Sequence, residues 1–406
     1  MKRNRLIQLG CVLLAGCSSG DKSTTSPETP TPLSVRFCQQ SGWLAYQNSG
    51  ADWQFAPITS DTITFNATES LSIAFSAGPE FTQVWSLDRE ELLELSGSSG
   101  FGCFTPPPPA TKTLFANVTG LFPGEVFQIL TPNGGSGGPP TTNTIRLAVP
   151  TGPVDLVGLA MDDTPERQVN RIIIRRQVNL PDSATMPAFD FSSSEMRGLK
   201  AVSALISGVH FATNTVQGSI FRSEQFFIPL GESTVSSTGS VWGVPAELML
   251  GDEINEYSVA ECPSICTRRV TYYFRALPST VVFGLGAAPA PTDQVTLTSF
   301  PCTRLSWTTP VQGDYPKFAN AVVTWGQNQS NSFAMTVTAG FTHHPPADAW
   351  RFEVPGFTRP DGSCLIPRGQ TPAGTATVGE NLNLFTGKLG VDGYITHTAS
   401  SAIYVH

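Results

Sequence analysis

Two histidines and a carboxylate that lie close together are the residues best suited to metal chemistry in this chain. They occur in the segment His343-His344-Pro345-Pro346-Ala347-Asp348. Imidazole and carboxylate groups suit zinc, but neighbouring strand residues point to opposite faces, so both histidines could reach one ion only at a turn. We therefore predict a solvent-exposed turn, with His343, His344 and Asp348 as weak metal candidates and no cofactor.

Four acidic residues precede Cys262 and raise the question of a calcium site. They are Asp252, Glu253, Glu256 and Glu261. Calcium loops of the EF-hand type need regularly spaced oxygen ligands and a central glycine, and this segment has neither. We do not predict calcium binding here.

The stretch Gly134-Gly135-Ser136-Gly137-Gly138 matches the pattern of a nucleophilic serine between glycines. That serine is activated only where a strand enters the turn and a helix leaves it. Pro132, Asn133, Pro139 and Pro140 flank the stretch and favour a flexible loop. We predict no catalytic residue in the chain.

Trp43 and Trp53, in the segment SGWLAYQNSGADWQF, are the sequence's best candidates for ligand binding. Exposed aromatic rings on a sheet can stack on sugars, whereas the same rings in a small sandwich usually fill the core. These two residues suggest a carbohydrate or an envelope protein as a partner. If both residues are replaced with alanine, intact folding indicates a binding platform, and loss of folding assigns the two rings to the core.

The elements that must position these groups are strands. Leu71, Ile73 and Phe75 alternate with serines, and Phe333 to Phe341 alternates with threonines in the same way. Alternation of this kind predicts strands with one buried face. We expect an all-β chain of two to four β-sandwich modules in tandem, with one short helix in the first.

The predicted helix begins at Leu87-Asp88-Arg89-Glu90-Glu91-Leu92. Asp88 can accept hydrogen bonds from the first free amides, and Glu91 occupies the reciprocal capping position. Leu87 and Leu92 are spaced for the hydrophobic contact that fixes such a start. Ser96-Gly97 is expected to end the helix after about two turns.

Six cysteines remain once Cys11 and Cys17 near the N-terminus are set aside. An even number of cysteines in an exported chain predicts disulfides, although six cysteines allow several pairings. Chain order and the domain boundaries favour three pairs. These are Cys38–Cys103, Cys262–Cys266 and Cys302–Cys364.

The N-terminus has the order of an export signal. Lys2, Arg3 and Arg5 precede a short apolar run that ends at Leu14-Ala15-Gly16-Cys17. The run is too short to cross a bilayer as a helix, which needs about 20 apolar residues. Because the small residues lead directly into a cysteine, this region resembles the lipobox of bacterial lipoproteins.

The resemblance to bacterial lipoproteins implies that residues 1–16 are removed and that Cys17 becomes acylated with palmitate-like chains, which anchor it in the membrane. In such lipoproteins an aspartate directly after the cysteine favours retention in the inner membrane. Ser18 stands at that position here, so the resemblance implies the outer membrane of the cell envelope. Residues 17–32 are small and polar with several prolines, a composition that predicts a disordered tether.

Composition shifts predict the remaining boundaries. We expect a small N-terminal β domain at 33–105, a proline linker at 106–109, a β-sandwich at 110–192 and a C-terminal β-rich region at 193–406 that forms one domain or two. Within 110–192, Ala148-Val149-Pro150-Thr151-Gly152-Pro153-Val154-Asp155-Leu156-Val157 resembles carboxypeptidase-regulatory and transthyretin-like sandwiches. That resemblance implies a spacer or a binding module.

The formal net charge is -8, and loss of residues 1–16 would remove only cations. Such a surface disfavours nucleic acid as a partner. We therefore expect a lipid-anchored envelope protein with a non-catalytic binding, display or assembly role. The alternative is an extracytoplasmic hydrolase of polysaccharide or peptide whose active site comes together only in the fold.

Overall fold

The structure is a computed structural model, and it describes most of the chain after residue 30. The described residues are 31–36, 42–48, 51–58, 62–67, 70–76, 81–98, 110–132, 134–139, 141, 144–180, 185–209, 215–223, 226–235, 237–251, 253–262, 267–288, 293–298, 302–326, 331–342, 346, 348–354, 358–367, 372–380 and 394–403. The predictions for the signal and the proline linker, and for Cys17, Cys38, Cys103, Cys266, His343 and His344, lie outside these residues. Of the predicted tether, residues 17–30 lie outside them too, whereas Thr31 and Pro32 belong to the first strand, Thr31–Arg36, so the prediction of disorder was wrong there.

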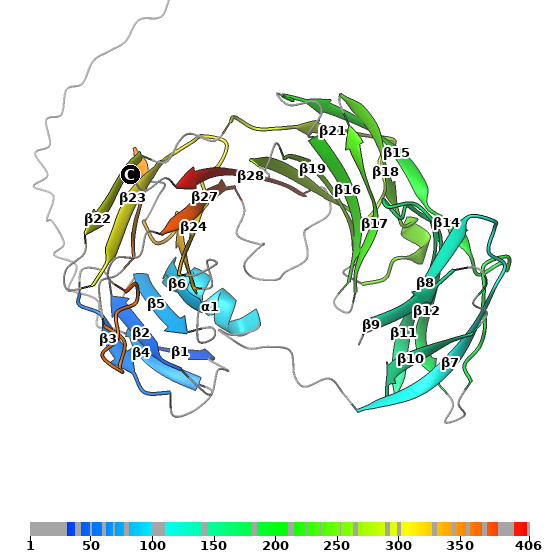
Figure 1. Cartoon of the computed structure of the whole chain (residues 1–406), viewed down its shortest axis with the longest axis horizontal. Helices are drawn as coiled ribbons and strands as arrows, with labels where there is room; N and C mark the ends of the chain where they lie inside the picture. The colour runs from blue at the N-terminus through cyan, green and yellow to red at the C-terminus, as the bar shows by residue number, and fades with distance from the viewer. Residues whose placement is uncertain are drawn as a thin grey trace, which may run out of the picture.

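The all-β prediction is confirmed. Among the described residues there is one α-helix, α1 (Arg89–Ser98), and one short 3-10 turn at Ala246–Leu248, while most others lie in strands. The strands form several sheets, and the sheets pack face to face as β-sandwich modules. In Figure 1 the strand ribbons follow an arc from the blue N-terminal strands to the cyan strands at the far end.

The first and last parts of the chain form one module together, here named the composite module. Its elements are β1 (Thr31–Arg36), β2 (Leu44–Asn48), β3 (Gln54–Ala56), β4 (Thr62–Ala67), β5 (Ser70–Ser76), β6 (Phe81–Asp88), α1, β22 (Asp293–Thr298), β23 (Arg304–Pro310), β24 (Phe318–Trp325), β25 (Asn331–Thr338), β26 (Ala349–Val354) and β27 (Ala373–Gly379). β6 pairs with β25 in parallel. The segment expected as a separate domain at 33–105 therefore shares its sheet with strands near the C-terminus.

The composite module has three layers. Its central sheet carries one apolar core against the β22–β23–β26 sheet and a second core against the β1–β4 pair and α1. Every residue of β5 is buried, because its leucine, isoleucine and phenylalanine face one core and its serines and alanine face the other. The prediction of a half-buried strand at Leu71–Phe75 was wrong in this respect, since Ser72 is buried and bonds to Ser86 Oγ at 2.7 Å.

The predicted capping box at α1 is confirmed. The Glu91 amide donates to Asp88 Oδ1 at 2.7 Å, and the Asp88 amide donates to Glu91 Oε2 at 3.0 Å. Leu87 and Leu92 are both buried in the core beneath β1 and β4. The Thr338 hydroxyl also donates to Glu91 Oε2, so the start of the helix is fixed to the end of β25.

Two further sandwiches lie between the two halves of the composite module. The first inserted module contains β7 (Thr111–Thr119), β8 (Glu125–Thr131), β9 (Gly134–Gly138), β10 (Thr144–Pro150), β11 (Pro153–Asp162), β12 (Val169–Asn179), β13 (Phe189–Asp190) and β14 (Arg197–Gly198). Its sheets, β10–β7–β13 and β14–β12–β11–β8–β9, enclose one core. The glycine-rich stretch that was predicted to be a loop is the edge strand β9, paired with β8.

The second inserted module contains β15 (Lys200–Ser207), β16 (Thr215–Arg222), β17 (Phe227–Val235), β18 (Thr238–Gly243), β19 (Ile254–Glu261), β20 (Arg268–Phe274) and β21 (Thr280–Gly284). The β18–β15–β21 sheet covers one side of its core, and strands β17, β16, β19 and β20 cover the other. Residues 200–406 therefore divide between this module and the composite module, whereas the first inserted module extends past the predicted boundary at 192 to include β14.

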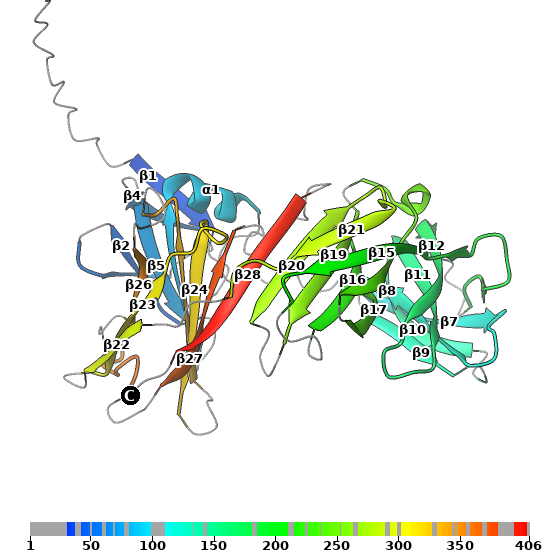
Figure 2. The same ribbon diagram turned by 90° about the horizontal axis from the view of Figure 1, so that it is seen from above.

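The last strand, β28 (Tyr394–Ile403), joins the second inserted module to the composite module. It pairs with β20 through residues 394–399 and with β27 through residues 398–403, so a 12-stranded sheet runs through both modules. Figure 2 shows β28 crossing obliquely between the two groups of strands. The join consists mainly of backbone hydrogen bonds. His397 of β28 adds a side-chain contact to each module, with Nδ1 2.7 Å from Glu380 Oε2 and Nε2 3.2 Å from the Gly284 carbonyl oxygen.

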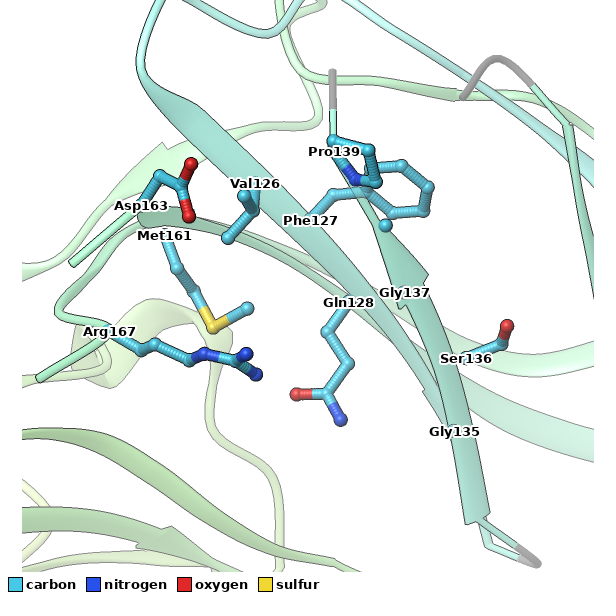
Figure 3. A pocket seen from close by; sticks show the side chains of 11 residues that line it. Val126, Phe127, Gln128, Gly135, Ser136, Gly137, Pro139, Met161, Asp163 and Arg167 are labelled. Carbon is cyan, nitrogen blue, oxygen red and sulfur yellow. The ribbon is translucent and has the colours of Figure 1, made fainter. Parts of the chain in front are cut away.

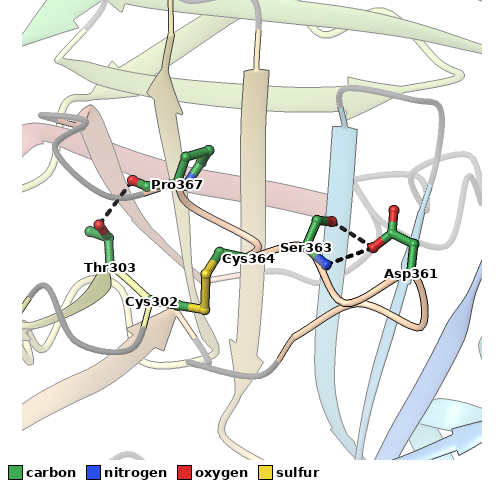
Figure 4. The surroundings of a disulfide bond; sticks show 6 residues. All are labelled: Cys302, Thr303, Asp361, Ser363, Cys364 and Pro367. Carbon is green, nitrogen blue, oxygen red and sulfur yellow. Dashed lines mark hydrogen bonds between the residues drawn. A yellow bond between two sulfur atoms is a disulfide. The ribbon is translucent and has the colours of Figure 1, made fainter.

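A disulfide holds the outer sheet of the composite module. Cys302 and Cys364 are joined with a Cα–Cα distance of 5.4 Å, which is the pairing that chain order predicted. Beside it, the Thr303 hydroxyl donates to the Pro367 carbonyl at 3.0 Å, as Figure 4 shows. Cys262 is also disulfide-bonded, while the expected partner Cys266 lies outside the described residues.

Candidate binding groove

A groove lies where the two inserted modules meet. Its larger part is a cavity of about 820 Å³ with walls from the first inserted module and from β16, β17 and β19. A neighbouring cavity of about 380 Å³ extends it along β8 and β9. Gln128, Met161 and Arg167 line both cavities, so the two are continuous.

An apolar core beneath the groove fixes the angle between the two modules. The outer face of β11 presents Val157, Leu159 and Met161, which pack against residues of β16 and β17 such as Phe221 and Ile228. β11 is buried on both faces because its alternate residues belong to the core of its own module. Burial on both sides gives the groove rigid walls.

A β-bulge adds to this contact. The pairing of β16 with β17 shifts between Ser219 and Ile220, and Leu230 is left between the paired residues, fully buried in the junction core. Gln168 of the first inserted module donates to the Leu230 carbonyl at 2.9 Å. A Cβ on Gly231 would lie 2.0 Å from the Gln168 side-chain oxygen, so a larger residue would displace the Gln168 side chain from this position.

An ion-pair network closes one side of the junction. Arg176 of β12 donates to Glu253 Oε2 at 2.6 Å, to Asp155 at 3.1 Å and to the Leu248 carbonyl at 3.0 Å. Burial disfavours the charged guanidinium, but the hydrogen bonds that Arg176 donates to Glu253 and Asp155 outweigh that effect and raise the pKa of Arg176. The group is therefore held as a cation between two carboxylates.

The wall from the first inserted module combines small and polar groups, shown in Figure 3. The Gln128 side chain on β8 and the guanidinium of Arg167 point toward the same space from opposite sides. Arg167 adopts a φ of +47° in a turn closed by its amide hydrogen bond to the Thr164 carbonyl. On β9, a Cβ at Gly137 would lie 2.4 Å from the Phe127 carbonyl oxygen, so the glycine permits close pairing of β9 with β8.

The opposite wall is a sheet face with one exposed aromatic ring. Phe227 at the start of β17 has 60% of its surface exposed, although Ile228 beside it is fully buried. The guanidinium of Arg222 lies 5.6 Å from the centre of the Phe227 ring. Arg269 of β20 is exposed at the far end of the same wall.

The polar sheet face continues from Arg269 toward β28. A smaller cavity of about 200 Å³ is lined there by residues of β19, β20 and β28, including Glu256, Thr271 and Thr396. Tyr273 is buried on this face, and burial together with the nearby Glu256 carboxylate raises the pKa of its hydroxyl to about 12. Glu256 accepts a hydrogen bond from Arg222 at 3.0 Å.

The structure assigns other roles to several predicted site residues. Trp43 and Trp53 are half-buried and pack against the core of the composite module, and Trp43 meets Phe55 edge to face with ring centres 6.1 Å apart. Asp348 is exposed and lies 3.6 Å from Arg351. Within the described ranges, no group of three or more histidine, cysteine, aspartate or glutamate side chains could hold a metal ion.

The acidic cluster before Cys262 is used in ion pairs. Glu253 pairs with Arg176, Glu256 pairs with Arg222, and Glu261 accepts from Arg268 at 2.6 Å. Arg268 also donates to the Gly208 and Gly286 carbonyls, both at 2.7 Å. Each described carboxylate of the cluster is therefore neutralised by an arginine rather than gathered around a cation; Asp252 lies outside the described residues.

Sequence reasoning missed the residues of the groove because they come from separate strands and turns. Gln128, Arg167, Phe227 and Arg269 are brought together only by the packing of the modules. One signal was present: in Phe226-Phe227-Ile228, the central ring occupies the position that alternation assigns to the solvent face. A large aromatic residue on the solvent face of a strand is a candidate contact residue.

The chain was compared with known protein families, curated proteins and solved structures. No protein-family description matches it, and no curated protein sequence is similar to it. Among solved structures, the crystal structure of chicken CNTN1 FN1-FN3 domains aligns over 76% of this chain and 88% of that chain, with 8% sequence identity and a TM-score of 0.16. In the part of the chain that the structure describes, no helix is long and apolar enough to cross a membrane.

Proposed function

We propose that this protein is a lipid-anchored component of the bacterial cell envelope whose β-sandwich modules carry out a non-catalytic binding role outside the cytoplasm. The observation that carries the proposal is Leu14-Ala15-Gly16-Cys17 directly after a basic and apolar start. Two acyl chains or more on Cys17 would bind the membrane firmly, at about 0.8 kcal/mol for each buried CH₂ group. Ser18 favours the outer membrane.

The disulfides support an oxidising compartment. Cys302 is bonded to Cys364, and Cys262 is also disulfide-bonded. Structural disulfides are rare in the reducing cytosol and common in exported proteins. The small, polar composition of residues 17–32 suits a tether that lets the folded modules reach away from the membrane surface.

The groove between the inserted modules supports a binding role. It is concave, its walls are rigid, and its charged groups include the exposed side chains of Arg167 and Arg269. A cavity of about 820 Å³ lies within the range of roughly 300–1,000 Å³ that is typical of sites for small ligands. Carbohydrate or the exposed segment of an envelope protein fits such a surface.

Metabolic labelling tests the anchor. Cells that produce the full chain are grown with labelled palmitate, and we expect label in the wild-type protein and none in Cys17→Ala. Cys11→Ala is the matched control, because Cys11 lies in the part of the signal that would be discarded, and it should take up label normally. Absence of label from the wild type would overturn the proposal, as would label that persists in Cys17→Ala.

A further inference from the structure

We propose that the groove between the inserted modules binds an uncharged oligosaccharide, with Phe227 as the platform on which a sugar ring stacks. The inference rests on the proposed binding role and names the class of ligand. It does not depend on the lipid anchor, since the groove is formed by residues far from the N-terminus.

The first argument is the exposure of Phe227. A phenylalanine side chain that is 60% exposed leaves apolar surface in water, and here that surface lies in a concave wall rather than on a convex edge. A pyranose ring has an apolar face of C–H groups and a rim of hydroxyls. The aromatic ring supplies the complement to that face, and the groups around it are polar.

The second argument is the charge of the surrounding groups. The charged residues that line the larger cavity are Arg167, Arg269, Glu166 and Glu232, two cations and two anions. Among the described residues, no hydrogen bond or ion pair is found for any of these four side chains. The neighbouring cavity adds Asp163, so the whole groove presents three anions and two cations. Such a mixture of signs favours a ligand with hydroxyl groups, which both donate and accept, over a ligand with a large net charge.

The third argument is the supply of further donors and acceptors on both walls. The Gln128 amide faces the groove from the first inserted module, and Ser258 of β19 lies on the opposite wall. An amide and a hydroxyl each donate and accept, and neither requires a charged partner. Because the junction core holds the walls in place, these groups need no reorganisation before they meet a ligand.

Affinity electrophoresis of the full-length protein in detergent tests the inference. Gels contain dextran, glycogen, laminarin, xylan or galactomannan as uncharged probes, and polygalacturonate as an anionic probe. We expect at least one uncharged polysaccharide to retard the wild type and Phe227→Ala to weaken that retardation about tenfold or more in apparent affinity. Arg167→Ala should weaken it about tenfold, through a lost charged hydrogen bond.

Phe122→Ala is the matched control. Phe122 is also 60% exposed, but it lies outside the groove, beneath the guanidinium of Arg171 at 4.0 Å. Its replacement should leave retardation unchanged, and thermal unfolding checks that each variant folds. The inference is overturned if no uncharged probe retards the wild type, if Phe227→Ala binds normally, or if only polygalacturonate is bound. Failure here with normal palmitate labelling would leave the anchor standing and remove only the assigned ligand.

Discussion

The two junctions between modules are built in opposite ways. The inserted modules meet through side chains: an apolar core that includes Phe221 and Leu230, and the Arg176 ion pairs at its side. The second inserted module meets the composite module through a strand, because β28 pairs with β20 on one edge and with β27 on the other. The first junction depends on which residues are present, whereas the second depends mainly on the backbone ladder, to which His397 and Tyr315 add side-chain hydrogen bonds.

This difference has consequences for the groove. A side-chain core permits little relative movement, since packed cores resist deformation. The groove lies at that junction, and its facing residues therefore stay at fixed separations. The ladder junction instead extends one continuous sheet, on which the polar face beyond Arg269 reaches β28.

The largest effect is expected from removing a ring in the side-chain junction. Phe221 is fully buried there, and Phe221→Ala should lower the free energy of unfolding by about 3–5 kcal/mol, through lost transfer energy and the cavity left behind. Urea denaturation measures the change. Phe227→Ala, one strand away and mostly exposed, should stay within about 0.5 kcal/mol. A loss for Phe221→Ala as small as that for Phe227→Ala would show that the junction core does not contribute to stability.

A smaller effect, of about 3 kcal/mol, is expected from breaking the ladder junction. Thr398 is paired with Arg269 of β20 and with Gly379 of β27, and its N–H points toward β20, as does the N–H of Ser400. Proline at this position therefore removes a donor from the β20–β28 ladder. Thr398→Pro should speed amide hydrogen exchange in β20 while exchange in the first inserted module stays slow. Thr398→Val keeps the backbone donor and should behave as wild type; if it does not, the junction depends on side chains after all.

The smallest effect is expected at the polar face beside β28. The pKa of Tyr273 is about 12 in the folded chain against an ordinary value of 10.0, so its contribution to stability is complete below pH 10 and is lost as pH rises from 10 to 12. Tyr273→Phe should reduce this alkaline loss. At neutral pH it should cost about 1 kcal/mol, through the hydrogen bond to Thr396. Unfolding measured across alkaline pH would contradict the assignment if both proteins lost stability equally.

Local patterns predicted local structure well. Alternation identified the strands, and the spacing of Leu87, Asp88, Glu91 and Leu92 predicted the start of α1 with its capping hydrogen bonds. Both depend on residues a few positions apart, where the backbone geometry is known in advance. The Cys302–Cys364 pairing followed from chain order.

The long-range arrangement could not be predicted in this way. Pairing of β6 with β25 joins residues more than two hundred positions apart, and a backbone ladder leaves no pattern in either strand. The prediction of a loop at Gly134–Gly138 was wrong for a related reason. Glycines usually mark loops, but here they permit close pairing of β9 with β8. The groove was missed because its walls come from two modules whose packing no local pattern records.

The shared sheet of the composite module also sets an order of events for the proposed export, in which the chain crosses the membrane with its N-terminus first. β6 then emerges long before β25, because both inserted modules lie between them in the chain. Until β25 arrives, the edge of β6 that pairs with it is open, and an unpaired edge can recruit the wrong strand. The two inserted modules can fold in the meantime. The first strands of the chain are thus among the last to be completed, and a chaperone outside the cytoplasm would be needed most at the beginning of the chain.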